Sequence, residues 1–158
     1  MWALIWIPAQ EGFGLADITL DALGLSTPLA LLVLVTVLLD RRLGGAYAGI
    51  KDGIANSLPR LSVVLIVCLL AAVATPPFPG FFSLLSVLML ASPVNMAGIL
   101  VIWLLWSWAV ARLIQGFVVG TPARDSSAQD IGLPLSWGLA MAFTVLLLTG
   151  VLFTGGLL

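Results

Sequence analysis

The stretch Ala74–Phe82, ATPPFPGFF, decides the fold because it places three prolines and a glycine inside a long apolar run. Each proline lacks a backbone N–H and disfavours helical geometry in the residue before it. A helix that reaches Thr75 is therefore expected to stop, and Gly80 is expected to let a second helix begin at Phe81. We predict a discontinuous helix at this position.

The composition of the whole chain identifies the medium around this break. Hydrophobic residues make up 61% of the 158 residues and charged residues 8%, whereas soluble domains are about half apolar and a quarter charged. The chain is therefore expected to be an all-α integral membrane protein, long enough for about four or five spans of ~20 residues each. The net charge of −1 and the scattered basic residues exclude a nucleic-acid-binding surface.

The inventory of reactive side chains excludes several kinds of chemistry. The chain has no histidine, and its single cysteine, Cys68, lies inside an apolar run. Disulfide frameworks, metal sites built from cysteine or histidine, haem ligation by histidine and histidine-based acid–base catalysis are thereby excluded. We predict no catalytic residues, no metal and no cofactor.

Charges and helix breakers divide the chain into four apolar blocks of one membrane domain, 1–158. The expected segments are an outer, interfacial segment 1–24, a first span 25–39, a cytoplasmic connection 41–60, a broken second span 61–91, a third span 98–119 and a fourth span 133–152. The part after the break, Phe81–Ala91, covers roughly 16 Å and cannot cross the ~30 Å hydrocarbon core alone. A single crossing for the second block places the basic connection on the same side as Arg124, in agreement with the positive-inside rule.

The backbone groups freed at the break need partners, because an unsatisfied group in hydrocarbon costs several kcal/mol. In transporters, discontinuous helices place such groups along an ion path. The candidates for a broken-helix site or ion path are Thr75, Pro76, Pro77, Pro79, Gly80 and Ser83. The alternative is that the prolines only kink the helix for packing. We expect another membrane subunit to cover Thr75 to Gly80, and lipid to surround the rest.

Two polar residues lie near the end of the third span. Arg112 is about 10 Å inside that end, and Gln115 lies on the same helix face. Their functional interpretation is a polar contact to the broken helix or to a neighbouring subunit. The alternative is an arginine that snorkels to the cytoplasmic interface.

Further candidates lie in the basic connection and in the third span. Lys51, Asp52 and Arg60 could face a partner from the connection, and the alternative is solvated loop charge. Three tryptophans of the third span are expected to pack against lipid or another subunit: Trp103, Trp106 and Trp108. The alternative is a quinone or pigment site.

The order of these features resembles the C-terminal part of the antiporter-like membrane subunits of respiratory complex I, Mrp-type cation/proton antiporters and energy-converting hydrogenases. The motifs that carry the resemblance are GG at 44–45, LPR at 58–60, PPFPGFF at 76–82 and ARLIQGFVVGTP at 111–122. Arg112 and Gln115 fall on the Arg and the first Gln of the family pattern YxLRxxQRxFFG. The resemblance covers about half of the chain, Gly44 to Pro122.

The chain departs from that family where the proton relay would lie. Members carry a lysine or another ionisable residue shortly after the glycine of the break, whereas this chain has GFFSLLSVL at 80–88. No charged residue lies between Leu61 and Trp108, and 158 residues hold at most one of the family's two five-helix units. The resemblance therefore implies a truncated relative that does not pump protons alone.

The implied function is that of an accessory subunit in a multi-subunit complex that is ion-translocating, redox-linked or related to inorganic carbon. The complex would lie in an energy-transducing membrane, either a bacterial inner membrane or a thylakoid-type one. The subunit would be structural or would lend a half-channel to a neighbour, and any enzymatic activity would belong to an oxidoreductase complex as a whole. One alternative is a self-contained, homo-oligomeric transporter or channel that uses the break as its site. Another is a membrane anchor for a soluble module that binds the connection Gly44–Arg60.

Overall fold

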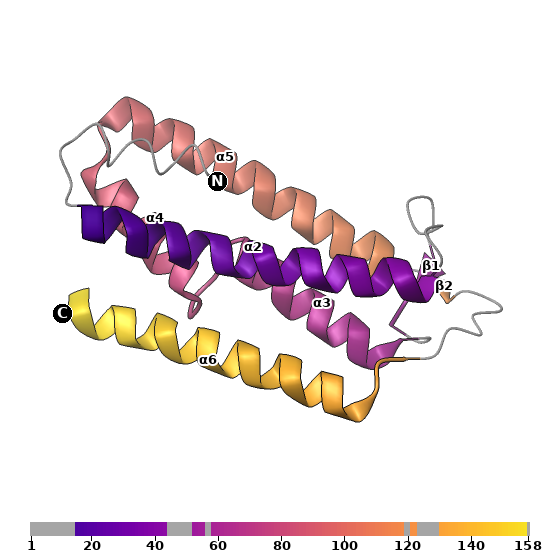
Figure 1. Ribbon diagram of the computed structural model, residues 1–158. Coiled ribbons are helices and arrows are strands. Elements are labelled where there is room, and N and C mark those ends of the chain that lie inside the picture. The colour runs from indigo at the N-terminus through magenta and orange to yellow at the C-terminus, as the bar shows by residue number, and fades with distance from the viewer. Residues whose placement is uncertain (1–14, 44–51, 56–57, 119–120, 123–129, 158) are drawn as a thin grey trace.

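The computed structural model describes residues 15–43, 52–55, 58–118, 121–122 and 130–157. Within these residues the fold is helical apart from one pair of two-residue strands (Figure 1), so the all-α prediction is confirmed. In chain order the elements are α2 (Leu15–Leu43), β1 (Asp52–Gly53), α3 (Pro59–Ala72), α4 (Pro79–Leu90), α5 (Pro93–Leu113), a π-helical turn (Ile114–Val118), β2 (Thr121–Pro122) and α6 (Leu133–Leu157).

Three of these helices are long and apolar enough to cross a membrane. Their apolar stretches are Ala22–Arg41 of α2, Pro93–Gly116 of α5 and the following turn, and Leu133–Leu152 of α6. Helix α2 begins at Leu15, well before the expected start at residue 25, because an apolar run marks the membrane-embedded part of a helix and polar turns extend into the interface. The expected interfacial segment therefore belongs to α2 from residue 15 onward, and residues 1–14 lie outside the described ranges.

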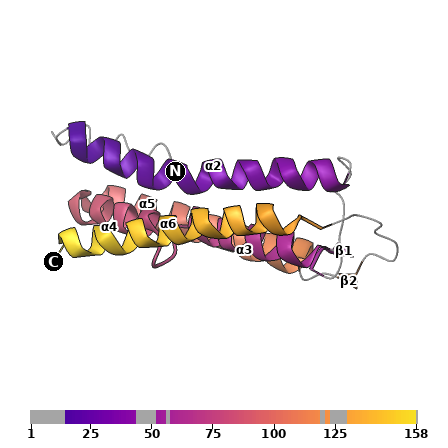
Figure 2. The same cartoon turned by 60° about the horizontal axis from the view of Figure 1, so that its bottom comes forward.

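The second apolar block forms two helices, α3 of 14 residues and α4 of 12 residues, separated at the predicted break. Helix α4 starts at Pro79 and not at the expected Phe81, because proline is favourable in a first helical turn, where its missing N–H is not needed. Figures 1 and 2 show that α4 continues from α3 toward the same end of the bundle.

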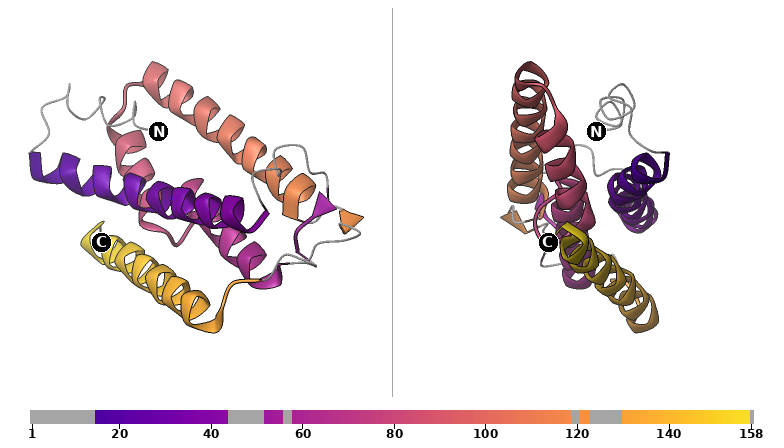
Figure 3. Two further views of the ribbon diagram at one scale, coloured as in Figure 1. Left: turned by 45° about the vertical axis from the view of Figure 1, so that its right-hand side comes forward. Right: turned by 90° about the vertical axis from the view of Figure 1, so that its left-hand side faces the viewer.

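The pair α3–α4 forms the centre of the molecule. Helix α2 and helix α6 each pack on both α3 and α4, and the main core includes Val35, Leu65 and Phe143 from these three layers. Helix α5 lies on the other side of the pair, away from α2 and α6 (Figure 3). It is held there by a smaller cluster in which Ile99 packs with Leu84 and Val87 of α4.

The two connections at one end of the bundle are joined to each other. Strand β1 pairs in parallel with β2, with Asp52 opposite Thr121. The Ala55 N–H also donates to the Val118 carbonyl at 3.1 Å. The connection between α2 and α3 therefore lies at the same end as the connection between α5 and α6.

Candidate functional site at the helix break

Most backbone N–H groups at the break donate to carbonyls of the same segment of the chain. The Thr75 N–H and hydroxyl both donate to the Leu70 carbonyl, at 3.3 and 2.9 Å. The Phe78 N–H donates to the Thr75 carbonyl at 3.0 Å, and the Phe81 N–H in turn donates to the Phe78 carbonyl at 3.0 Å. Ala74 makes the turn with φ of 59°, a left-handed conformation that a residue with a Cβ rarely adopts. The peptide bond Pro76–Pro77 is cis.

Two tryptophans of α5 supply hydrogen-bond donors at the end of α3. The indole Nε1–H of Trp103 donates to the Val73 carbonyl at 2.7 Å, and that of Trp106 donates to the Ala72 carbonyl at 3.2 Å. These carbonyls belong to the last turn before the break, which lacks helical donors. The N–H groups of Trp103 and Trp106 thus bond within the chain, while Trp106 is still 37% exposed. Packing of the three tryptophans against lipid or another subunit stays a prediction. Trp108 is 59% exposed.

Glycines in the neighbouring helices bring backbone directly against the break. A Cβ added at Gly150 of α6 would overlap the Pro77 carbonyl oxygen and would lie 3.0 Å from the Pro79 nitrogen. A Cβ added at Gly80 would lie 3.5 Å from the carbonyl oxygen of Gly24 in α2. Helix α6 thus approaches the break too closely to leave room for a Cβ at Gly150, whereas α2 lies in ordinary van der Waals contact with Gly80.

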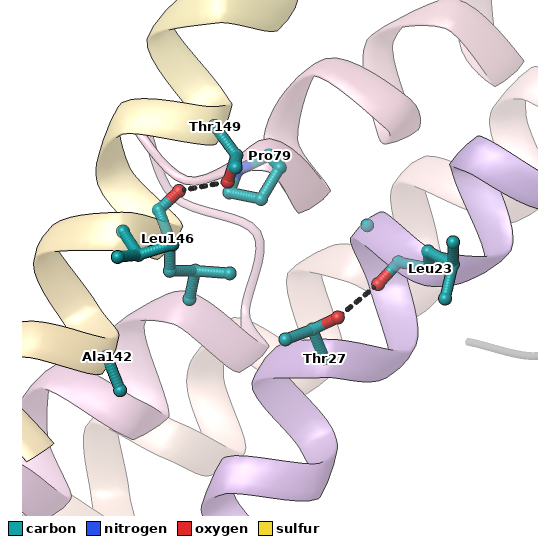
Figure 4. Close-up of a pocket in the computed structure, with 8 residues that line it drawn as sticks. Leu23, Thr27, Pro79, Ala142, Leu146 and Thr149 are labelled. Carbon is teal, nitrogen blue, oxygen red and sulfur yellow. Dashed lines mark hydrogen bonds between the residues drawn. The ribbon is translucent and has the colours of Figure 1, made fainter.

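A cavity of about 280 Å³ lies between these helices, beside the first residue of α4. Figure 4 shows Thr149, Leu146 and Ala142 of α6 along one wall, with Pro79 at the end of the wall and α2 opposite. The two threonine hydroxyls of the cavity donate to carbonyls of their own helices: Thr149 to Leu146 at 2.7 Å and Thr27 to Leu23 at 2.7 Å. The cavity wall is therefore mostly apolar, and the hydrogens of its two hydroxyl groups already form hydrogen bonds within α6 and α2.

Ser83 is the one residue in the predicted set whose polar atom is buried and has no hydrogen-bond partner within the described part of the chain. Its side chain is 1% exposed, and a Cβ added at Gly24 would come within 2.8 Å of its Oγ. The hydroxyl thus points at the backbone of α2, next to the cavity.

The other candidates of the break divide into a covered and an open group. Pro79 and Gly80 are buried, and Thr75 is half-buried, whereas Pro76 and Pro77 are exposed. Much of the break is therefore covered by the chain's own helices. A further subunit over this region would meet chiefly the corner formed by Pro76 and Pro77.

Arg112 and Gln115 lie away from the break. Both are exposed, Arg112 in the last turn of α5 and Gln115 in the π-helical turn. Neither side chain is joined by a hydrogen bond or ion pair to another residue in the described ranges. Their contact to a neighbouring subunit stays a prediction.

Of the three candidates in the connection, Lys51 lies outside the described residues, and Asp52 contributes its backbone to β1. Arg60 is a residue of the first turn of α3, and its guanidinium donates to the Ile131 carbonyl at 3.2 Å. The Asp130 carboxylate accepts from the backbone N–H groups of Arg60 and Leu61, at 2.9 and 3.3 Å. Arg60 is thus exposed but bonded within its own chain, and Asp130, just before α6, caps α3.

The comparisons with known protein families, curated proteins and solved structures find no match for this chain. The resemblance to antiporter-like subunits therefore stays a prediction. Among the described residues there is also no group of three histidine, cysteine, aspartate or glutamate side chains that could hold a metal ion.

The residues that close the break escaped the sequence analysis. Trp103 and Trp106 stand at i and i+3 of one helix, a spacing that places two N–H donors on the same face. That face could have been matched to the carbonyls that the prolines leave free. Gly150, in contrast, gives no local signal, because only the packing of α6 on the break makes it special.

Proposed function

We propose that the chain is an accessory membrane subunit of a multi-subunit, ion-translocating complex that is redox-linked or related to inorganic carbon. In this proposal it has a structural role and does not pump protons by itself. The observation that carries the structural role is the closure of the break, where the indoles of Trp103 and Trp106 occupy carbonyls that an ion would otherwise use. Membership of such a complex, in a bacterial inner membrane or another energy-transducing membrane, rests on the sequence resemblance.

We further propose that α3 and α4 together form a fourth crossing. At 1.5 Å per residue, α3 covers about 21 Å and α4 about 18 Å, so neither spans the ~30 Å core alone. Their continuation in one direction supports a single, interrupted span. The fourth crossing puts the start of α2 and the end of α6 on the side opposite to the joined connections.

The half-channel version of the proposal depends on Ser83. A proton path across the membrane needs titratable groups or ordered water, and the cavity beside the break is walled mainly by apolar groups. The Ser83 hydroxyl lies next to the cavity and has no hydrogen-bond partner within the described residues. It could therefore donate to water, whereas the hydroxyls of Thr27 and Thr149 in the wall already donate to their own helices. A neighbouring subunit would have to supply every ionisable group of such a path.

The cavity and the Ser83 hydroxyl also favour a second candidate, a self-contained homo-oligomeric transporter that uses the break as its site. The two proposals differ in what the purified chain does alone. The transporter would move an ion across the wall of a proteoliposome, and its flux would fall on Ser83→Ala. The subunit would give no flux above that of empty liposomes.

The experiment that tests the proposed function is isolation of the native complex through a tag on this chain, from membranes solubilised in a mild detergent. The expected result is a large assembly with other ion-translocating or quinone-reducing membrane subunits, identified by mass spectrometry. Migration of the chain alone or as a homo-oligomer would contradict the proposal and would favour the independent transporter.

A further inference from the structure

Helix α5 has two opposite faces with different surroundings. Its inward face carries Ile99 and Trp103, which pack in the smaller cluster with α4, and Val110, which is buried in the main core. At about 100° per residue, Arg112 lies on the opposite side, roughly 180° from Trp103. The apolar residues on the Arg112 side are all exposed: Val94 by 82%, Val101 by 56%, Leu105 by 62% and Trp108 by 59%.

This outer face of α5, defined by Val94, Val101, Leu105, Trp108 and Arg112, contains a charge within an apolar span. Arg112 lies inside the stretch Pro93–Gly116, which is apolar and long enough to cross a membrane. Charged side chains within spans generally face protein or water and pair with a counter-charge. In the described part of the chain no acidic side chain bonds to Arg112. By helical geometry Arg112 lies on the side of α5 that faces away from the bundle.

Small residues on the same face leave room for a second helix. A Cβ added at Gly98 or at Gly116 would meet no atom within 4 Å, and Ala109 is exposed between them. Small residues at such positions allow helix backbones to approach closely in a membrane. Helix α5 is also the least buried of the three long apolar helices, so its own chain supports it on one side only.

We propose that the outer face of α5 docks a membrane-spanning helix of another subunit, and that this helix presents an aspartate or glutamate to Arg112. Charge complementarity selects this occupant, because a second copy of the same face would bring two arginines together. A lipid phosphate reached by snorkelling would neutralise Arg112 without using the small residues Gly98, Ala109 and Gly116 beside it. Gln115, one turn further on, would meet a polar group of the same helix. The inference rests on the proposed function for the existence of a second subunit and adds the location and chemistry of the contact.

The test uses the full chain in its native membrane, with a photo-crosslinking amino acid placed at Leu105. The matched control is Val33 of α2, which is also 62% exposed but lies on another helix. The expected result is a crosslink from position 105 to a span of a different protein that carries an aspartate or glutamate about two turns from the crosslinked residue, the separation of Leu105 and Arg112 on α5. Position 33 should give no crosslink to that span.

Charge variants then test the pairing itself. Arg112→Glu should lower the amount of crosslinked subunit recovered with this chain by about tenfold or more, because it opposes two like charges at the contact. Arg112→Lys should retain most of it, because the positive charge is kept. Replacing the partner's acidic residue by lysine should restore recovery in the Arg112→Glu background.

The remaining outcomes overturn the inference in distinguishable ways. Crosslinks from position 105 only to lipid, or to a second copy of this chain, would show that the face has a different occupant. Unchanged recovery with Arg112→Glu would exclude the charge pair. If the large assembly is still isolated in these cases, the proposed function stands and only the docking face is wrong. If the wild-type chain brings down no other subunit, both fail.

Discussion

Within the described residues, polar groups are satisfied in one region of the molecule and unpaired in another. The first region is the break between α3 and α4, and the second is the outer face of α5. At the break, backbone carbonyls and N–H groups find partners from the same chain, and glycines of α2 and α6 allow close contact. On the outer face of α5, a full charge at Arg112 lies among exposed apolar residues with no partner in the described ranges. The break, which is the most irregular feature of the sequence, is thus the region whose polar groups are better satisfied by hydrogen bonds within the fold.

The difference follows from how the two kinds of polar group can be satisfied. Backbone groups at a helix end cannot move far, so the chain that breaks the helix must itself bring donors to it or leave the groups exposed to hydrocarbon. A long arginine side chain, in contrast, can reach a counter-charge that another molecule supplies. We therefore interpret the break as a packing element and the α5 face as the part of the molecule that needs another protein.

The largest effect is expected from Gly150→Ala. The new methyl group would overlap backbone of the break at Pro77 and approach Pro79, which backbone cannot relieve by a rotamer change. We expect a loss of about 3 kcal/mol in the free energy of unfolding, measured by denaturation in detergent micelles. The control is Gly138→Ala on the same helix, where a Cβ meets nothing within 4 Å. Equal stability of the two variants would mean that α6 does not pack on the break.

Removal of one indole donor at the break should have the next largest effect. Trp103→Phe keeps most of the ring but leaves the Val73 carbonyl without its 2.7 Å hydrogen bond, which should cost about 2 kcal/mol of unfolding free energy. Trp106→Phe, whose bond is longer at 3.2 Å, should cost less. Trp108→Phe, on the outer face, should change stability by less than about 0.5 kcal/mol in detergent. A reversed order would contradict the assignment of the inner and outer faces.

A smaller effect is expected at the other end of α3. Asp130→Asn weakens the acceptor for the backbone N–H groups of Arg60 and Leu61, and a lost charged cap costs about 1 kcal/mol. Asp40→Asn, at an exposed position in the last turn of α2, serves as the control for the change in net charge. Hydrogen exchange of the first turn of α3 should accelerate in Asp130→Asn only, and equal acceleration in both variants would exclude the cap.

The smallest effect is expected from Ser83→Ala. The hydroxyl is buried without a partner in the described structure, so its removal should leave the unfolding free energy within about 0.5 kcal/mol or raise it. A loss of more than about 1 kcal/mol would indicate that the hydroxyl is bonded to water or to another subunit in the folded protein. That result would indicate that the cavity beside the break binds water or a partner and is not only a packing gap.

The sequence predicts the location of the break well, because the effects of Pro76, Pro77 and Pro79 on a helix are local. It predicts the helix boundaries less well: α2 is longer than its apolar run, and α4 begins at a proline. The closure of the break could not be predicted in the same way, because it depends on tertiary packing. Asp130 caps a helix turn 70 residues earlier in the chain, and Gly150 matters only once α6 crosses the break.

The most direct test of the account is the access of water to the break. Thr75→Cys in a Cys68→Ala background places a single thiol at the break, and a charged thiol reagent reacts only where water reaches the thiolate. In native membranes we expect no labelling at position 75 from either side, while Asp40→Cys in the same background, at the exposed end of α2, should label readily. Rapid labelling at position 75 would contradict a closed break and would favour a water-filled ion path there.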